Sequence, residues 1–246
     1  MRSGVVLITG GSRGIGAAVA TAAAAAGWQV AITYRARAAE AKQVLARIES
    51  YGVRGLAVAG DVADEGDVKR VFDQAQALGP VRALVNNAGI TAGAARVADA
   101  TLEQLESVFR TNVIGTMLCA REAVRRMSTA RGGQGGAIVN ISSGAARTGS
   151  PGTWVHYAAT KGAVDSFTLG LAREVAIEGI RVNAVRAGPT QSEMSGSDPT
   201  HAASLAASLP MGRMAQPEEI AAAVMWLLDP AGSYVTAALI DAAGGL

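Results

Sequence analysis

Short runs of Val, Ile and Leu alternate along the chain with longer stretches that have helical periodicity. The short apolar runs predict strands at Val5–Thr9, Gln29–Tyr34, Gly55–Ala59, Ala83–Asn86, Ala137–Ile141, Arg181–Val185 and Ala238–Asp241. The longer stretches predict helices at Ile15–Ala26, Ala38–Tyr51, Glu65–Leu78, Leu102–Met127, Val155–Glu178 and Pro217–Leu228. Apolar strands that alternate with helices are typical of a parallel sheet covered on both faces.

The chain has 246 residues and contains no linker long enough to separate domains. We therefore expect one doubly wound α/β domain spanning residues 1–246, with a parallel sheet of about seven strands and helices on both faces. One irregular stretch, Thr190–Gln216, carries Pro, Ser and Gly around a weakly helical segment. We expect this stretch to form a flap over the functional site.

Composition narrows the functional classes. Half of the residues are hydrophobic and 17% are charged, which indicates a substantial core. The net charge is +2, and the basic residues are spread along the chain instead of forming a patch, so a nucleic-acid partner is not expected. The single cysteine, Cys119, excludes an intrachain disulfide and indicates no metal cluster.

No run of about 18 uninterrupted apolar residues is present, so we expect no segment that spans a membrane. The N-terminal residues lack a long apolar run that ends in a cleavage site and lead directly into the first predicted strand. These features predict a cytoplasmic protein.

The stretch LITGGSRGIG, Leu7–Gly16, fits two kinds of site. Gly10 to Gly14 match the G-x-S-x-G pattern of a hydrolase, in which Ser12 would be the nucleophile. Alternatively, Gly10, Gly14 and Gly16 form a turn that holds phosphates at a helix N-terminus. The two histidines, His156 and His201, allow a hydrolase triad by count, but such an elbow would not follow the first strand. A purely structural turn remains open on these residues alone.

A second motif points to proton transfer. Tyr157 and Lys161 are four residues apart on a predicted helix and therefore share one face. An ammonium beside a phenol favours phenolate and makes tyrosine usable as a general acid or base. Ser142 and Ser143 follow the predicted strand Ala137–Ile141, at the strand end where such sheets bind ligands. Considered alone, Tyr157 and Lys161 could also be a solvated pair on the protein surface, and Ser142 and Ser143 could be turn residues.

Together and in this order, the motifs resemble those of the classical short-chain dehydrogenase/reductase family over the whole chain. The matching segments are Thr9–Gly16 for the T-G-x-x-x-G-x-G turn, Asp61-Val62 for the acid that meets the adenine, Asn86–Gly89 for N-N-A-G, and Asn112, Ser143, Tyr157 and Lys161 for the catalytic four. The resemblance implies a Rossmann fold. In length and lack of insertions, the chain is similar to 3-oxoacyl-[acyl-carrier-protein] reductases.

The resemblance also implies roles for the catalytic four. Tyr157 would exchange a proton with a carbonyl or alcohol substrate, and Lys161 would lower the Tyr157 pKa and hold the nicotinamide ribose. Ser143 would bind the substrate oxygen, and Asn112 would order a water that relays protons to Lys161. Ser143 precedes Tyr157 by 14 residues, one more than in many relatives, so Ser142 is an alternative. We expect His156 to line the entrance to the site.

The cofactor implied is a nicotinamide dinucleotide, and we expect NADP(H) to be preferred over NAD(H). The residues expected to bind it are Gly10, Ser12, Arg13, Gly14, Ile15, Gly16, Tyr34, Arg35, Asp61, Val62, Asn87, Ala88, Gly89, Tyr157, Lys161, Gly188, Thr190 and Ser192. NAD-preferring relatives carry an acid at the end of the second strand. This chain has Tyr34 there, followed by Arg35 and Arg37, and arginine matches a phosphate in two contacts.

The family pattern changes at three places. Ala187-Gly188 replaces the usual Pro-Gly after the sixth strand, Ser192 replaces a frequent threonine, and Ala237 replaces a frequent glycine. The substrate could be a 3-oxoacyl thioester, a sugar, a polyol or another ketone. A non-catalytic dinucleotide-binding protein of the same fold is the alternative. We expect a homotetramer or homodimer that pairs through Leu102–Met127, Val155–Glu178 and the last strand.

Overall fold

A computed structural model describes residues 4–191 and 199–246 of the chain. Their strands form one parallel sheet in the order β3-β2-β1-β4-β5-β6-β7. The strands are β1 (Val5–Ile8), β2 (Gln29–Tyr34), β3 (Gly55–Ala59), β4 (Val81–Asn86), β5 (Gly136–Ser143), β6 (Ile180–Ala187) and β7 (Leu239–Ala242). The predicted doubly wound α/β fold with a seven-stranded parallel sheet is confirmed.

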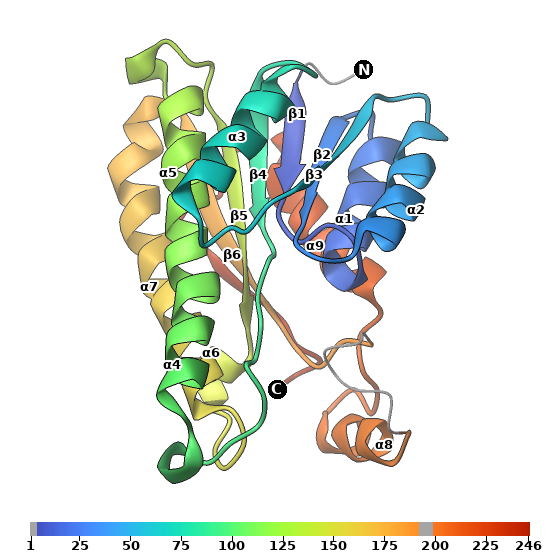
Figure 1. Ribbon diagram of the computed structural model, residues 1–246, viewed down its shortest axis with the longest axis vertical. Coiled ribbons are helices and arrows are strands. Elements are labelled where there is room, and N and C mark those ends of the chain that lie inside the picture. Colours follow the sequence, from blue (N-terminus) through green and yellow to red (C-terminus); the bar gives the residue numbers. More distant parts are fainter. Residues whose placement is uncertain (1–3, 192–198) are drawn as a thin grey trace.

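Helices cover both faces of the sheet (Figure 1). One face is covered by α1 (Gly14–Ala25), α2 (Ala38–Glu49) and α9 (Pro217–Leu228), and the other by α3 (Glu65–Gln76), α5 (Gly115–Met127) and α7 (Val155–Val175). Alternate strand residues supply the two cores: Val6 and Ile8 of β1 pack with α1, whereas Val5 and Leu7 pack on the opposite face. Each core therefore uses one half of the apolar residues in a strand.

The helix predicted at Leu102–Met127 is not one regular helix. It consists of α4 (Leu102–Phe109), a π-helical turn at Arg110–Ile114, and α5. The Gly115 amide donates to the Arg110 carbonyl, which is the i to i+5 bond of a π turn. A Cβ added to Gly115 would lie 2.7 Å from Val62 Cγ2, so the glycine lets the helix approach the segment after β3.

The functional site forms at the edge of the sheet where the carboxyl ends of the parallel strands lie. β1 lies between β2 and β4: the chain runs from β1 to β2 and β3 on one side and then crosses to β4 on the other, and such a reversal of strand order creates a ligand-binding crevice in open α/β sheets. β5 and β6 are longer than predicted, because Ser142 and Ser143 continue the pairing opposite Arg186 and Ala187.

Shorter elements follow the strands or link the helices. They are α6 (Ala145–Thr148), α8 (Pro199–Ser208) and 3₁₀ turns at Val97–Asp99, Thr129–Arg131, Ala176–Glu178 and Pro230–Gly232. Of the predicted flap Thr190–Gln216, residues 192–198, including Ser192, lie outside the described residues. The flanking parts of the flap meet in a bridge between Thr190 and Ala215. None of the described helices is long and apolar enough to cross a membrane.

Candidate active site

Hydrogen bonds from two directions hold the glycine-rich turn after β1. The Gly10 amide donates to Thr33 Oγ1 at 3.1 Å, and Asn87 Nδ2 donates to the carbonyls of Thr9 and Gly10 at 3.0 and 2.9 Å. A Cβ added to Gly16 would lie 2.4 Å from the Gly10 carbonyl oxygen, so only glycine allows α1 to begin this close to the turn. The turn and the segment after β4 therefore form one fixed backbone surface.

The N-terminus of α1 is suited to an anion. It has no capping side chain and no acidic residue in its first turn, which leaves amide groups and the positive end of the helix dipole for a ligand. Ser12 is buried within the turn, and Arg13 is the N-cap residue. His156 is not beside Ser12, because its Nε2 lies 2.9 Å from the Thr91 carbonyl oxygen. This arrangement favours a phosphate site over a nucleophile.

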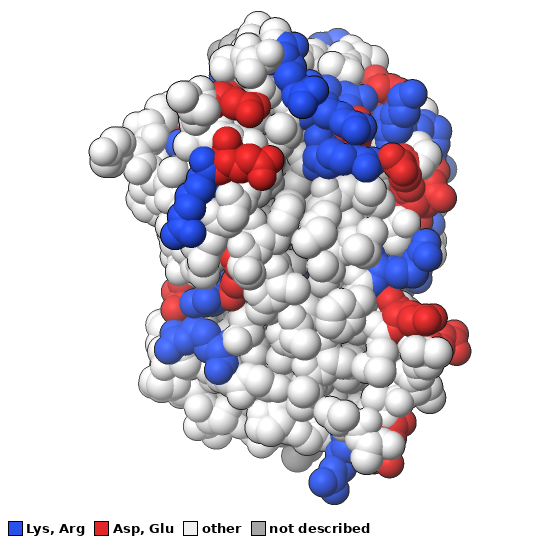
Figure 2. All heavy atoms as spheres, turned by 90° about the vertical axis from the view of Figure 1, so that its left-hand side faces the viewer, with Lys and Arg blue, Asp and Glu red and all other residues white. Residues whose placement is uncertain are grey.

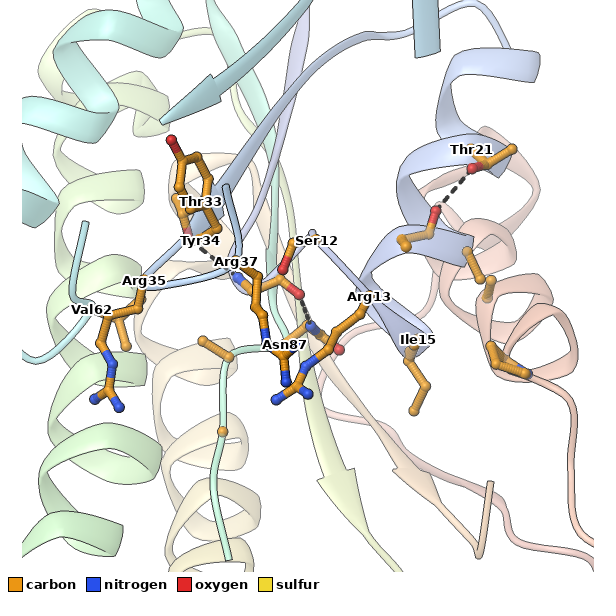
Figure 3. A pocket seen from close by; sticks show the side chains of 18 of the residues that line it. Ser12, Arg13, Ile15, Thr21, Thr33, Tyr34, Arg35, Arg37, Val62 and Asn87 are labelled. Carbon is orange, nitrogen blue, oxygen red and sulfur yellow. Dashed lines mark hydrogen bonds between the residues drawn. The ribbon is translucent and has the colours of Figure 1, made fainter. Parts of the chain in front are cut away.

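A pocket of about 720 Å³ lies at the carboxyl ends of β1, β2 and β4 (Figure 3). Most of the predicted cofactor residues line it: Gly10, Ser12, Arg13, Gly14, Ile15, Tyr34, Arg35, Asp61, Val62, Asn87, Ala88 and Gly89. The lining also includes Arg37, which the sequence suggested as a phosphate partner, and residues that the sequence did not suggest, among them Thr33, Ile90, Thr111 and Gln191. Ile90 directly follows the N-N-A-G motif, and Thr111 directly precedes Asn112, so adjacency to a motif was the available signal.

Three arginines extend into this pocket from the glycine turn and the end of β2 (Figure 3). Arg37 Nη1 donates to Glu40 Oε1 at 2.9 Å. The pKa of Glu40 is lowered by a hydrogen bond from its own backbone, by that hydrogen bond from Arg37, and by the charges of Arg37 and Arg13. Arg35 instead lies 3.6 Å from Asp61 Oδ2, toward the β3 side. Arg13 and Arg37 therefore share one electrostatic environment, and Arg35 belongs to another.

Tyr157 lies in the first turn of α7 and is half-buried. Burial raises the pKa of its phenol, and a hydrogen bond with Ser143 lowers it. Ser143 Oγ also accepts a hydrogen bond from the Ala145 amide at 3.1 Å. Ser142, by contrast, donates its hydroxyl to the Lys161 carbonyl at 3.4 Å. The structure thus brings Ser143 to Tyr157 despite the longer loop between them, and places the alternative Ser142 elsewhere.

Lys161 lies one helical turn after Tyr157 and is buried. Its Nζ donates to the Ile141 carbonyl at 2.7 Å and lies 5.6 Å from the centroid of the Tyr157 ring. Burial lowers the pKa of Lys161 to about 8, against the opposing charge of Asp165. The expected net lowering of the Tyr157 pKa by Lys161 is not found. Burial dominates the Tyr157 pKa, and the hydrogen bond that opposes it comes from Ser143.

Asn112 lies in the π turn and is buried. Its Oδ1 accepts a hydrogen bond from the Ile90 amide at 2.9 Å, and its Nδ2 donates to the Ile90 carbonyl at 2.9 Å and to Thr160 Oγ1 at 3.0 Å. A Cβ added to Gly89 would lie 3.3 Å from Asn112 Oδ1 and 3.7 Å from Lys161 Nζ. The Asn112 amide and the Lys161 ammonium therefore border the same space, and Asn112 also fastens the segment after β4 to α7.

Two further predicted residues, Gly188 and Thr190, lie just after β6. The Gly188 amide donates to the Ala242 carbonyl at 3.0 Å, and Thr190 Oγ1 donates to the Gly188 carbonyl at 2.9 Å. The Ala187 carbonyl accepts a hydrogen bond from the Gly144 amide at 2.9 Å, which joins this loop to the residue after Ser143. The expectation that His156 lines the entrance is wrong, because its side chain is buried against Thr91.

Comparisons with known proteins find relatives that cover nearly the whole chain. Residues 10–246 match the family described as enoyl-(acyl carrier protein) reductase. The chain is 47% identical over 246 residues to the uncharacterized oxidoreductase YgfF of Escherichia coli (strain K12), covering 98% of this chain and 99% of that protein. It is 34% identical over 255 residues to the NADPH-dependent aldehyde reductase-like protein, chloroplastic, of Arabidopsis thaliana, covering 98% and 93%.

Two solved structures show the same fold. A short chain dehydrogenase from Burkholderia cenocepacia J2315 in complex with NADP has a TM-score of 0.91 and 35% identity, covering 98% of this chain and 96% of that one. A 3-ketoacyl-(acyl-carrier-protein) reductase from Brucella melitensis complexed with NADH has a TM-score of 0.91 and 33% identity, covering 98% and 97%.

Proposed function

The chain belongs to the short-chain dehydrogenase/reductase family of oxidoreductases, and we propose that it transfers a hydride between NADP(H) and a carbonyl or secondary alcohol carbon. One observation carries the proposal: the half-buried Tyr157 phenol lies beside the Ser143 side chain, which opposes the rise in the phenol pKa that burial causes, and one helical turn from the buried Lys161. The nicotinamide, when bound, supplies or accepts the hydride. The protein must then supply or accept the proton.

Tyr157 Oη is the proton donor for a carbonyl oxygen in reduction and the acceptor in oxidation. Ser143 holds the same substrate oxygen by a hydrogen bond, because its side chain lies beside the Tyr157 phenol. The raised Tyr157 pKa keeps the phenol protonated near neutral pH, which favours the reductive direction. Asn112 borders the space beside Lys161, where a water would return a proton to the Lys161 amine after the ammonium has given one up. The substrate class is a ketone, among which 3-oxoacyl thioesters, sugars and polyol-derived ketones all fit this chemistry.

The residues present fit a dinucleotide. Glycine at position 16 is required by the closeness of α1 to the turn, and the uncapped start of α1 offers amides to a pyrophosphate. Asp61 and Val62 would border the adenine, and Asn87 to Gly89 would lie along the middle of the cofactor. Tyr157, Lys161, Gly188, Thr190 and Ser192 would surround the nicotinamide end.

The preference for NADP(H) over NAD(H) is supported by the side chains at the end of β2. No acid occupies the position of Tyr34, and Arg13 and Arg37 lie close enough to act on the same carboxylate, Glu40. A 2′-phosphate carries more charge than that carboxylate and would be a better partner for two guanidinium groups. Relatives differ, since one solved structure holds NADP and another NADH, so the argument depends on these arginines.

Cofactor preference is tested by kcat/KM with NADPH and NADH. We expect NADPH to be preferred in the unmodified protein, and Tyr34→Asp combined with Arg35→Ala to shift the preference toward NADH. Arg37→Ala should raise the KM for NADPH about tenfold, because it removes a charged hydrogen bond to phosphate. Arg47→Ala is the matched control, since Arg47 lines the same pocket from the last turn of α2. Equal or better kcat/KM with NADH in the unmodified protein would contradict the preference.

The proton-transfer role is tested by Tyr157→Phe with NADPH and a panel of ketones. The substitution removes only the hydroxyl, so turnover should be abolished while the Kd for NADPH, measured by fluorescence, stays within about twofold. More than a tenth of the wild-type rate would remove Tyr157 from this role. No turnover of any ketone or alcohol by the unmodified protein would favour the non-catalytic alternative.

A further inference from the structure

A buried ion pair lies one helical turn beyond Lys161. Asp165 follows Lys161 by four residues on α7, so the two side chains share one face of the helix. Arg186 on β6 donates from Nε to Asp165 Oδ2 at 2.8 Å, and the two side chains are 18% and 8% exposed. Neither residue has a place in the proton transfer proposed above.

The Asp165 carboxylate is only partly satisfied by Arg186. Its other oxygen, Oδ1, is buried and has no hydrogen-bond partner among residues 4–191 and 199–246. A buried carboxylate oxygen without a donor is costly unless positive charge lies near it. The charged groups around this carboxylate in the described chain are Arg186 and, on α7 itself, Lys161. The charge of Asp165 opposes the lowering of the Lys161 pKa that burial causes.

Arg186 also lies close to a second carboxylate, Asp241, which in turn pairs with Arg147. Arg186 Nη1 lies 3.7 Å from Asp241 Oδ1 on β7, and Arg147 Nη1 on α6 donates to Asp241 Oδ2 at 2.8 Å. In the sheet register, Arg186 pairs with Ser142 on one side and Asp241 on the other. Ser142 in turn donates to the Lys161 carbonyl. Ser142 and Arg186, which pair in the sheet, therefore contact two successive turns of α7: Ser142 contacts the turn that carries Lys161, and Arg186 contacts the turn that carries Asp165.

We propose that Asp165 and Arg186 are positioning residues for Lys161: Arg186 holds the Asp165 carboxylate in place, and the Asp165 carboxylate helps to keep the buried Lys161 ammonium charged. The catalytic consequence rests on the proposed function, in which Lys161 serves as a cation. Arg186 fixes the carboxylate and at the same time competes for its charge. Removal of Asp165 and removal of Arg186 should therefore act on Lys161 in opposite directions, which a merely structural ion pair would not do.

The experiment is a pH titration of the cofactor-free protein by NMR with ¹³C-labelled lysine. The chain has only three lysines, Lys42, Lys69 and Lys161, so the Lys161 signal is identified by its loss in Lys161→Met. We expect Asp165→Asn to lower the Lys161 titration midpoint by about one pH unit and Arg186→Gln to raise it. Asp165→Glu keeps the charge and should restore most of the wild-type midpoint.

Glu122→Gln is the matched control. Glu122 is equally buried and pairs with Arg125 and Arg126 on α5, so the substitution breaks a comparable ion pair away from Lys161 and should leave the midpoint unchanged. An unchanged midpoint in Asp165→Asn, or shifts of the same sign in both variants, would overturn the proposal. If Arg186→Gln does not fold, Asp165→Asn against Asp165→Glu still decides. In turnover assays, the pH at which kcat/KM falls on the alkaline side should shift together with the Lys161 midpoint. A shift of the midpoint without a shift of this kcat/KM profile would still support the effect of Asp165 on Lys161, but it would contradict the proposed role of Lys161 in the reaction.

Discussion

Burial lowers the pKa of Lys161 to about 8, and the unfolded chain has the ordinary lysine pKa near 10.5. Between these two values the unfolded state binds a proton that the folded state does not, so this group makes the protein more stable as pH rises. Below about pH 8 the folded protein keeps the ammonium charged at a cost in stability. Residues that serve a reaction often carry such a cost.

Lys161→Met should therefore raise the free energy of unfolding at pH 7 by about 1 to 3 kcal/mol while abolishing turnover. The gain should shrink as pH rises from 8 to 10.5, because the wild-type lysine becomes neutral in the folded state. Urea denaturation at several pH values measures both effects. Lys69→Met, at an exposed lysine on α3, should show neither. A gain that does not change with pH would mean that improved packing, and not charge, is its cause.

The turn before β7 shows how one residue can strain an element. Ala237 has a φ of +59°, a left-handed conformation that costs a residue with a Cβ about 1 to 2 kcal/mol. The conformation is held because the Ala237 amide donates to the Val182 carbonyl at 2.8 Å and the Ala238 amide donates to Asn183 Oδ1 at 2.9 Å. The alanine stands where relatives often have glycine, and the structure supplies the reason for glycine there.

Ala237→Gly should stabilise the protein by about 0.5 to 1 kcal/mol, because relief of strain outweighs the greater freedom of glycine in the unfolded chain. Thermal unfolding measures the change. Ala238→Gly is the neighbouring control and should destabilise by a similar amount, since Ala238 does not have a positive φ. Loss of stability in both variants would contradict the assignment of strain to Ala237.

The bounds of strands and helices could be predicted from the sequence where the spacing of their apolar residues matches the residues that are buried in the core. The strands Gln29–Tyr34 and Gly55–Ala59 and the helix Pro217–Leu228 have the predicted bounds. The π turn at Arg110–Ile114 was not predictable, because one extra residue in a turn does not interrupt an apolar pattern. At the site, residues of the glycine turn and of the N-N-A-G segment line the pocket. The pairing of Asp165 with Arg186 could not be predicted, because contact between two elements is not visible in the spacing along the chain.

At the scale of the whole molecule, α4 and α5 expose apolar side chains. Leu102, Leu105, Phe109, Ile114 and Met117 are 37% to 69% exposed. On the face that carries these helices, charged side chains lie at the upper end and along the flanks, and a broad central area is uncharged (Figure 2). Exposed apolar patches of this kind mark association sites. We propose that this face pairs with a second copy of the chain in a homodimer or homotetramer.

Light scattering at micromolar concentration should give a dimer or tetramer. Phe109→Glu combined with Ile114→Glu should produce a smaller species, because burying two carboxylates in an apolar interface is unfavourable. Gln43→Glu adds a negative charge on an exposed position of α2 and should leave the assembly unchanged. A monomeric wild-type protein would contradict the proposed pairing.

The order in which strands leave the ribosome differs from their order in the sheet. β1 is made first, but its neighbour β4 follows only after β2 and β3, and β7 is made after all other strands. Pairing of parallel strands across such separations is slow compared with local helix formation. A nascent chain that has completed β6 already contains Tyr157, Lys161 and Arg186, yet it lacks Asp241, which ties Arg186 to Arg147. The row of ion pairs beside α7 is therefore completed only at the end of synthesis, after all four residues proposed for proton transfer have been made.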